Sequence, residues 1–407
     1  MTAQPPLAPF RRARRAAALD VSEIVQISEA ARALKEQGRD ILTFGTGEPD
    51  FPTPAHVIEA AHRAALDGET RYPPTQGTAA LRRAIAADVL RWTGVRVEIP
   101  EIIVSTGAKQ VISNAFLATL DPGDEVIVPA PYWTSYGDIV ATCEGVLVPV
   151  ATRADNGFRL SPADLEAAIT PRTRWLMLNA PGNPSGAMYS AEDLAALAAV
   201  LARHPQVMVL ADEIYQHIAY QPFTSLRAAA PELADRTLIV NGVSKSYAMT
   251  GWRLGWGIGP VEMIRAMVAI QGQSTSGASS ISQAAALAAL TGPQDLLAER
   301  CAAFQARRDF VLDRINATGR LHCEAPGGAF YLYVSCGGVI GLRTPGGETI
   351  GSDADFCRYL LQEAGVALVP GRAFGLSGYF RLSYAYAQTD LAEGCRRIAA
   401  AVAALKE

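Results

Sequence analysis

Residues 241–256 read NGVSKSYAMTGWRLGW and follow an apolar Leu-Ile-Val run at 238–240. Short continuous apolar runs are typical of strands buried on both faces of a parallel sheet. Lys245 stands five residues after that run, in a turn of small and polar residues, and Arg253 follows eight positions later. Taken alone, the stretch fits a solvated surface lysine as well as a lysine held in a binding crevice. The neighbouring strand ends must therefore decide between the two.

Further apolar runs precede this one, and each is closed by small or polar residues. They lie at residues 102–104, 126–128, 146–148, 175–178 and 207–210. Helical stretches such as residues 190–203 separate several of them, which favours an α/β doubly wound, mostly parallel sheet over about residues 50–300. Ligands of such sheets bind beyond the carboxyl ends of the strands.

The C-terminal part of the sequence has a different pattern, which predicts a smaller α+β domain. It contains expected helices at 293–317, near 354–364 and from about 389, and expected strands at 329–333, 366–369 and 380–383. An N-terminal helix at 28–37, with Ser28 as its cap, joins this domain. We expect an N-terminal arm at 1–19, a small domain from 20–48 and 310–407, and a large domain at 49–309.

Composition excludes several classes of protein. The chain has 407 residues, 49% of them hydrophobic, and a net charge of −4, so it offers no basic field for nucleic acid or a membrane surface. Six scattered cysteines without a C-x-x-C pair and five histidines without ligand spacing give no sign of a disulfide framework or a metal site. Neither a secretory signal nor a membrane-spanning run is evident. We expect a cytoplasmic protein.

Chemically useful side chains follow four other predicted strands. Each has a structural alternative: an ordinary tight turn, a core tryptophan, a plain loop or a helix-capping aspartate. Small residues at a strand-to-helix turn, however, also let backbone N–H groups face an anion. The residues concerned are Gly107, Ala108 and Lys109 in one turn, then Trp133, Asn179, Asn183, Asp212 and Tyr215.

Together these groups suit one kind of ligand, pyridoxal 5′-phosphate, a phosphorylated planar aldehyde with a ring nitrogen. A partly desolvated lysine has a lowered pKa and can attack an aldehyde carbon. In this hypothesis Lys245 bonds the aldehyde, the Gly107 turn and Arg253 hold the phosphate, Trp133 stacks on the ring, Asp212 meets the ring nitrogen, and Asn183 and Tyr215 meet the phenolate oxygen.

Five stretches, SKSYAMTGWRLGW, NAPGNPSG, ADEIY, GEPDFPTP and FRLSYA, together resemble the class I aminotransferases of the aspartate aminotransferase fold, a fold type I group, and in particular their bacterial aspartate/prephenate branch. The resemblance runs from about residue 20 to the C-terminus. It implies a homodimer with active sites at the subunit interface. It also implies transfer of an amino group between an α-amino acid and a 2-oxo acid, with aspartate or glutamate and 2-oxoglutarate as the expected substrates.

The resemblance carries over residue by residue. It makes Lys245, Asp212 and Tyr215 catalytic. It assigns the cofactor to these three together with Gly107, Ala108, Lys109, Trp133, Asn183, Ser244, Arg253 and Tyr72, the last reaching the partner subunit's phosphate. It assigns the substrate to Gly47, Trp133, Asn183, Arg381 as the α-carboxylate ligand, and Asn179 as the asparagine that accompanies Arg381.

Departures from the family pattern leave the substrate open. Gly242 replaces a common serine, so a phosphate hydroxyl is lost or comes from Ser244 or Ser246. Asp20 stands where this branch often has a lysine that holds a distal carboxylate, and a polar loop at 271–276 is a further candidate for the distal pocket. The alternatives are an aminotransferase for aromatic or other neutral amino acids, or a lyase with the same cofactor. A regulator built on this fold would need a DNA-binding domain, for which the residues before Val21 are too few.

Overall fold

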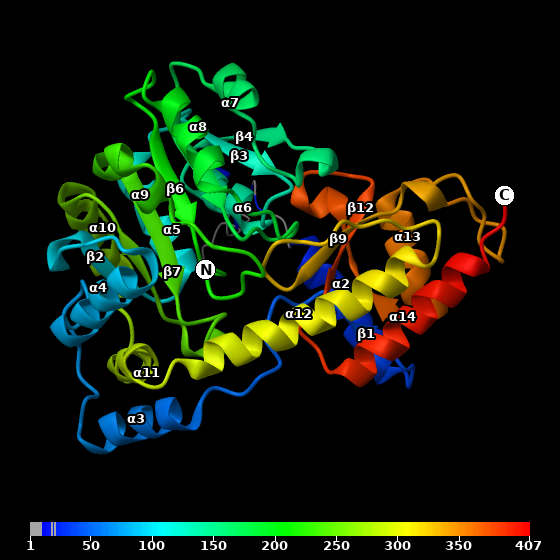
Figure 1. Ribbon diagram of the computed structural model, residues 1–407, viewed down its shortest axis with the longest axis horizontal. Coiled ribbons are helices and arrows are strands. Elements are labelled where there is room, and N and C mark those ends of the chain that lie inside the picture. Colours follow the sequence, from blue (N-terminus) through cyan, green and yellow to red (C-terminus); the bar gives the residue numbers. More distant parts are fainter. Residues whose placement is uncertain (1–9, 18, 20–21) are drawn as a thin grey trace, which may run out of the picture.

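The computed structural model describes residues 10–17, 19 and 22–407. A part built around a large sheet and a part built around a small sheet lie side by side in Figure 1. The long helix α12 (Asp295–Asn316) runs from the first part into the second. The domain limit expected between residues 309 and 310 therefore falls inside a continuous helix, and the domain limits remain a prediction.

The large sheet has seven strands, and all but one run in the same direction. β8 is antiparallel to both of its neighbours, β2 and β7. The spatial order is β2 (Ile102–Ser105), β8 (Gly255–Ile258), β7 (Thr237–Gly242), β6 (Met208–Asp212), β5 (Thr173–Asn179), β3 (Glu125–Ala130) and β4 (Val146–Ala151). The expected runs all form strands of this sheet, whereas β8, which the sequence did not predict, lies between two of them.

The apolar runs form strands because both faces of the sheet are covered. Within a run, alternate side chains point to opposite faces. Ile102 and Leu176 belong to the core on one face, and Ile103 and Trp175 belong to the core on the other. The first face is covered by α3 (Ala55–Leu66), α4 (Ala79–Thr93), α7 (Pro162–Ala168), α8 (Ala191–Leu201), α9 (Leu226–Ala229) and α11 (Ser280–Thr291), and the second by α5 (Ala108–Thr119), α6 (Ser135–Thr142) and α10 (Val261–Ser274).

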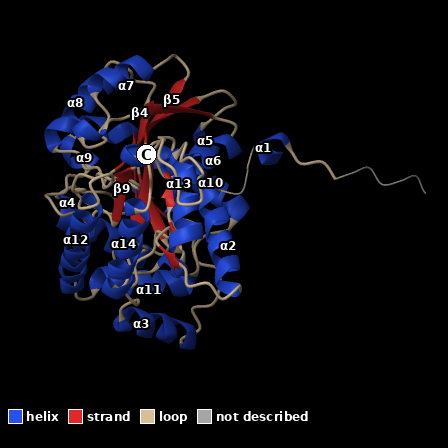
Figure 2. Cartoon of the chain, turned by 90° about the vertical axis from the view of Figure 1, so that its right-hand side faces the viewer, coloured by secondary structure: helices blue, strands red, loops and turns tan. Residues whose placement is uncertain are grey.

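The smaller part is α+β, as expected. Its antiparallel sheet has the order β11 (Val369–Pro370), β12 (Tyr379–Ser383) and β9 (Tyr331–Ser335), and a parallel pair joins β1 (Leu42–Thr43) to β10 (Val366–Ala367). Its helices are α2 (Glu23–Glu36), α13 (Asp353–Tyr359), which continues as a π-helical turn at Leu360–Ala364, and α14 (Gln388–Ala403). A short helix, α1 (Arg14–Ala17), lies at the periphery (Figure 2).

Three expectations about this part are wrong in detail. Helix α2 begins at Glu23, so Ser28 lies inside it, where its hydroxyl donates to the carbonyl oxygen of Ile24 at 2.8 Å instead of capping the helix. The run at 366–369 is divided between β10 and β11, which belong to different sheets. Strand β9 begins at Tyr331, after the expected start at residue 329.

The described residues contain no helix long and apolar enough to cross a membrane and no cluster of three metal-ligating side chains. All six cysteines are free thiols. The segment that follows β6 packs Ile214, Tyr215 and Ile218 into the core of the smaller part. The carboxyl edge of the large sheet is therefore in contact with the smaller sheet.

Candidate active site

A cavity of about 330 Å³ lies at the carboxyl edge of the large sheet. Because β2, β3, β5, β6 and β7 share one direction, the residues after them meet there. The cavity brings together nearly all of the predicted site residues, namely Gly47, Ala108, Lys109, Trp133, Asn179, Asn183, Asp212, Tyr215, Ser244, Lys245, Arg253 and Arg381. A larger hollow of about 540 Å³ between residues 154–159 and 322–327 contains none of them. Chemistry, rather than size, therefore singles out this cavity.

Two predicted residues do not line the cavity. Gly107 borders it, because a Cβ at that position would lie 2.6 Å from Nη2 of Arg253. Tyr72 is 92% exposed on this chain. Asp20 lies outside the described residues.

The lysine of the opening stretch lies inside the cavity and is partly buried. Its Nζ donates a 2.6 Å hydrogen bond to the carbonyl oxygen of Gly47. Desolvation lowers the pKa of Lys245 to about 8, and the positive charges of Arg381 and Arg253 act in the same direction, although Glu48 opposes them. The amine is therefore still mostly protonated at pH 7, but about a tenth of it is neutral and nucleophilic there, far more than for an ordinary lysine.

Asp212 is the last residue of β6, and its carboxylate is buried. Oδ2 accepts a 2.7 Å hydrogen bond from the hydroxyl of Tyr136, and Oδ1 accepts one of 3.2 Å from the Ile214 amide. Burial raises the pKa of Asp212 to about 6, and the Tyr136 hydrogen bond works against that rise. Within the described part of the chain no cation is bonded to this buried carboxylate, which is therefore well placed to meet a positively charged ring nitrogen.

Arg381, on β12, is the fully buried cation of the site, only 2% exposed. Nη1 donates to Oδ1 of Asn183 at 2.8 Å, and Nη2 donates to the Gly45 carbonyl at 2.5 Å. Its guanidinium lies over the rings of Tyr331 and Phe374, 4.6 and 4.9 Å from their centroids. These partners are neutral, and Nε is buried without a hydrogen bond to any residue that the structure describes. A buried charge with only neutral partners is costly, and binding of an anion would offset that cost.

The structure corrects the pairing of the two asparagines. Arg381 was expected to be accompanied by Asn179, but the side chain that contacts it is that of Asn183. Instead, Oδ1 of Asn179 accepts a hydrogen bond from the backbone amide of Asn183 at 2.8 Å, and its Nδ2 donates one to the backbone carbonyl of Asp212 at 2.9 Å. Both side-chain groups of Asn179 are used to fix the loop that carries Asn183.

The predicted phosphate turn is a strand-to-helix turn that lacks side-chain bulk. Gly107 has φ +85° and precedes α5, whose first two residues, Ala108 and Lys109, line the cavity at the helix end where backbone amides lack intrahelical partners. Arg253 lies beside the turn in a left-handed conformation, with φ 54° and Nη1 bonded to the Thr250 carbonyl at 2.9 Å. The start of β8 also packs closely against the turn. Gly255 permits this contact, because a Cβ there would lie 2.4 Å from the Ala108 amide nitrogen.

The departure at Gly242 has a steric reason. A Cβ at Gly242 would lie 2.9 Å from both the Cα of Gly255 and the Leu254 carbonyl, because β8 packs against β7 there. Of the two serines considered as substitutes, Ser244 lines the cavity. The Ser246 hydroxyl is buried and has no hydrogen-bond partner among the residues described.

Several cavity residues were missed by the sequence reasoning. Tyr136 follows Trp133 by three residues, and their rings meet edge to face at 5.3 Å. The Tyr331 and Tyr215 hydroxyls lie 2.9 Å apart, and Ile24 reaches the cavity from α2. The i, i+3 spacing of Trp133 and Tyr136 was the available signal. Conversely, residues 271–274 of the expected polar loop belong to α10.

Comparisons with known proteins agree with this geometry. Residues 39–398 match a family described as aminotransferase class I and II. The chain is 54% identical over 394 residues, 96% of each chain, to an aspartate aminotransferase of Rhizobium meliloti strain 1021. It is 49% identical over 386 residues, 94% of this chain and 96% of the other, to an aspartate/prephenate aminotransferase of Cereibacter sphaeroides. The crystal structure of an aspartate aminotransferase from Rhizobium meliloti superimposes with a TM-score of 0.96 at 53% identity, covering 98% of this chain and 100% of that one. The structure of an aspartate aminotransferase from Thermus thermophilus with maleate superimposes with a TM-score of 0.89 at 40% identity, covering 97% of this chain and 100% of that one.

Proposed function

The chain belongs to the class I and II aminotransferases and is an enzyme of that kind, and from this premise we propose that it uses pyridoxal 5′-phosphate to exchange amino groups between aspartate or glutamate and 2-oxo acids. Its substrates are then an amino acid and a 2-oxo acid, with 2-oxoglutarate as the expected acceptor. The observation that carries the proposal is the meeting, in one cavity, of a lysine of lowered pKa, a buried carboxylate and a buried arginine whose partners among the described residues are neutral.

The residues of the cavity fit the proposed cofactor. When bound, pyridoxal phosphate supplies an electron sink for the bonds at the substrate's Cα. On the protein side, the α5 amides after Gly107, the Ser244 hydroxyl and Arg253 would hold the phosphate. Asp212 would keep a proton on the ring nitrogen, Asn183 and Tyr215 would donate to the phenolate oxygen, and Trp133 would cover one face of the ring.

Lys245 would both bind the aldehyde carbon and move the reacting proton. Its Nζ donates a hydrogen bond to the Gly47 carbonyl, which holds it inside the cavity. With cofactor and substrate bound, Nζ would be the basic group that moves the proton at the substrate's Cα, and its lowered pKa suits proton transfer near neutral pH. Tyr215, whose pKa burial raises well above its ordinary value, remains a protonated donor throughout.

Arg381 would orient the substrate through its α-carboxylate. Its donors are already fixed by Asn183 and Gly45, and its guanidinium also contacts the rings of Tyr331 and Phe374. An arginine held in this way recognises a carboxylate as a bidentate pair. The Gly47 backbone and Asn179 would line the same end of the cavity.

A distal carboxylate would meet Lys109. The other cations that line the cavity already have roles in this proposal. The Nζ of Lys109 lies 4.7 Å from the centroid of the Trp133 ring and 3.0 Å from the Ser135 hydroxyl. Desolvation and the nearby Arg253 lower the pKa of Lys109, a penalty that an acidic substrate would relieve. With a cation at Lys109, the aspartate at position 20 does not argue against dicarboxylic substrates.

Neutral or aromatic amino acids are the second candidate substrates, because Ile24 and Trp133 add apolar surface to the cavity. We also propose a cytoplasmic homodimer. Tyr72 is exposed on this chain, as a residue that completes a partner's site would be, and buried free thiols are compatible with a reducing compartment.

The deciding experiment follows the bound cofactor and the products together. The purified protein is loaded with pyridoxal phosphate and mixed with single amino acids, and the visible absorbance of the lysine-bound cofactor is monitored. We expect aspartate and glutamate to bleach that band, 2-oxoglutarate to restore it, and no keto acid to form in Lys245→Ala. Ammonia release without amino transfer would indicate a lyase. A faster reaction with phenylalanine than with aspartate would favour the second candidate substrates.

A further inference from the structure

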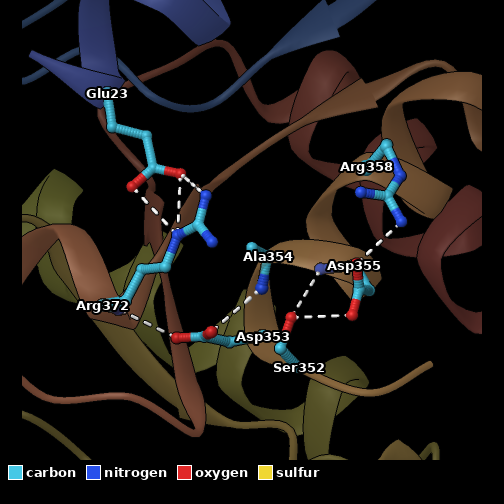
Figure 3. A network of polar contacts seen from close by, with 7 residues as sticks. All are labelled: Glu23, Ser352, Asp353, Ala354, Asp355, Arg358 and Arg372. Atoms are coloured by element: carbon cyan, nitrogen blue, oxygen red, sulfur yellow. Dashed lines mark hydrogen bonds and ion pairs between the residues drawn. The ribbon is translucent and has the colours of Figure 1, made fainter.

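The start of helix α2 forms part of the wall of the active-site cavity. Ile24, the second residue of the helix, lines the cavity, and together with Ile27 it packs against a cluster that includes Phe374 and Val369. Glu23, the first residue, makes an ion pair with Arg372. Nε and Nη2 of the guanidinium donate to Oε1 at 3.0 and 2.6 Å, and Nε also reaches Oε2 at 3.3 Å (Figure 3).

Arg372 is itself held in place by a buried carboxylate. Its backbone amide donates to Oδ2 of Asp353 at 2.8 Å, and Oδ1 of Asp353 accepts the Ala354 amide at 2.9 Å (Figure 3). Asp353 is only 2% exposed and opens helix α13. The guanidinium of Arg372 therefore projects from a backbone position that is fixed to α13, and the ion pair ties the start of α2 to that position.

The same short turn, Gly371–Phe374, reaches the substrate end of the site. The Phe374 ring lies 4.9 Å from the Arg381 guanidinium. The Phe374 carbonyl accepts the backbone amide of Tyr132 at 3.0 Å, next to Trp133. One turn thus contacts the start of α2, the proposed α-carboxylate ligand and the loop of the proposed stacking tryptophan.

From these contacts we infer that Arg372 is a positioning residue, which holds Glu23 and thereby Ile24 against the substrate end of the cavity and so strengthens binding of the amino acid. This rests on the proposed function, in which Arg381 receives the substrate. The ion pair touches none of the reacting groups, so its loss affects substrate affinity and leaves the chemical step intact. When the first turn of α2 loosens, Ile24 leaves the wall, and water enters beside Arg381.

The expected effect is moderate, because the side chain of Arg372 is 55% exposed and that of Glu23 is 24% exposed. Loss of an ion pair with two donor nitrogens and this exposure should raise KM by about twofold to fivefold. The kcat should stay within about twofold of that of the wild type, since the proton-transferring group is untouched.

The test uses the cofactor-loaded enzyme with aspartate and 2-oxoglutarate, and it compares Arg372→Gln, Glu23→Gln and the double variant. Arg358→Gln is the matched control, because Arg358 pairs with Asp355 at 2.7 Å in the same network but does not reach α2 (Figure 3). Amide hydrogen exchange of residues 23–30 is measured on every protein. We expect both single variants to raise KM and to accelerate exchange, the double variant to match the single ones, Arg372→Lys to be intermediate, and Arg358→Gln to behave as wild type.

Two results would overturn the inference. If Arg372→Gln and Arg358→Gln have the same KM and the same exchange rates, the pair does not position α2. If exchange accelerates but KM does not change, Ile24 does not contribute to substrate binding. Failure of the wild type to use aspartate would instead reject the proposed function, and unchanged exchange in Arg372→Gln would still overturn the tie between Arg372 and α2.

Discussion

The hydroxyl of Tyr136 donates a 2.7 Å hydrogen bond to Oδ2 of Asp212, and both side chains are buried. The pKa of Tyr136 is raised well above its ordinary value, by burial first and then by Asp212, so this hydroxyl remains protonated and can only donate to the carboxylate. The same ring meets Trp133 edge to face. One side chain on α6 thus supports both the proposed partner of the ring nitrogen and the proposed stacking surface.

Replacing Tyr136 with Phe should shift the acid limb of the pH–rate profile to higher pH. Burial raises the pKa of Asp212 to about 6, and the hydrogen bond from Tyr136 opposes that rise. Without it, Asp212 stays protonated to higher pH, so the ionised form is lost at a pH about one unit higher, as expected for a hydrogen bond to a charged group. The kcat/KM for aspartate measured from pH 5 to 9 checks this.

Tyr359→Phe is the control for the loss of a buried tyrosine hydroxyl. That hydroxyl donates to the Ala401 carbonyl at 3.0 Å, in the smaller part of the molecule. This variant should lose some stability and keep the wild-type pH profile. An identical acid limb in Tyr136→Phe and wild type would mean that the hydroxyl does not support ionised Asp212.

Replacing Lys245 with Met should stabilise the cofactor-free protein while abolishing its activity. The folded-state pKa of Lys245 is about 8, below its ordinary value of 10.5 in an unfolded chain. At pH 7 the lysine is protonated in both states, so folding bears the full cost of burying the charge. Between about pH 8 and 10.5 the unfolded chain binds more protons, so the wild type gains stability as the pH rises, and the cost disappears.

We therefore expect Lys245→Met to raise the free energy of unfolding at pH 7 by about 1–3 kcal/mol, the lower figure allowing for the lost hydrogen bond to Gly47. The difference should shrink at pH 10. Urea unfolding of both cofactor-free proteins at the two pH values measures it. A variant less stable than wild type at pH 7 would show that the lysine is not strained by burial.

Most of the residues predicted from the sequence line one cavity, because the signal that singled them out is local. Polar residues that follow a buried apolar run within a few positions lie at or just beyond a strand end: Asp212 is the last residue of β6, and Lys245 lies three residues after the end of β7. The missed strand β8 had no comparable run, since glycine alternates with Trp256 and Ile258 there, and those glycines are required by close packing against Val111 and Ala108.

Contacts between distant segments could not be read from spacing alone. Tyr136 and Asp212 are 76 positions apart, and the pairing of Arg381 with Asn183 rather than Asn179 depends on how one loop turns. The start of α2 at Glu23 could have been predicted from the sequence, because apolar residues repeat at helical spacing at Ile24, Ile27, Ala31 and Leu34. Ser28 was mistaken for a cap, since serine also occurs inside helices when its hydroxyl bonds a carbonyl one turn earlier.

Replacing Lys109 with Met should change substrate preference more than overall activity. If the ammonium binds a distal carboxylate, its loss removes a charge-assisted contact made by aspartate but not by alanine. We expect kcat/KM for aspartate to fall by about tenfold or more, and that for alanine to change by less than about twofold. Parallel half-reactions with the two amino acids measure the ratio. An equal loss for both would instead assign Lys109 to the cofactor.

Restoring the family serine at position 242 should weaken the protein rather than improve cofactor binding. A Cβ there would press on the Gly255 Cα and the Leu254 carbonyl, both 2.9 Å away, and these backbone atoms cannot move without shifting β8. Forcing extra atoms into such a contact costs about 1–3 kcal/mol. Gly272→Ser is the control, because a Cβ at Gly272 meets nothing within 4 Å.

Chemical denaturation and titration with pyridoxal phosphate separate the two effects of Gly242→Ser. We expect a lower free energy of unfolding and a cofactor affinity no better than that of the wild type, because β8 carries Gly255, whose close approach to Ala108 shapes the proposed phosphate turn. Tighter binding at unchanged stability would show that the serine hydroxyl reaches the phosphate. In that case the β7–β8 contact would have room for a side chain, and Ser244 would not be the substitute donor.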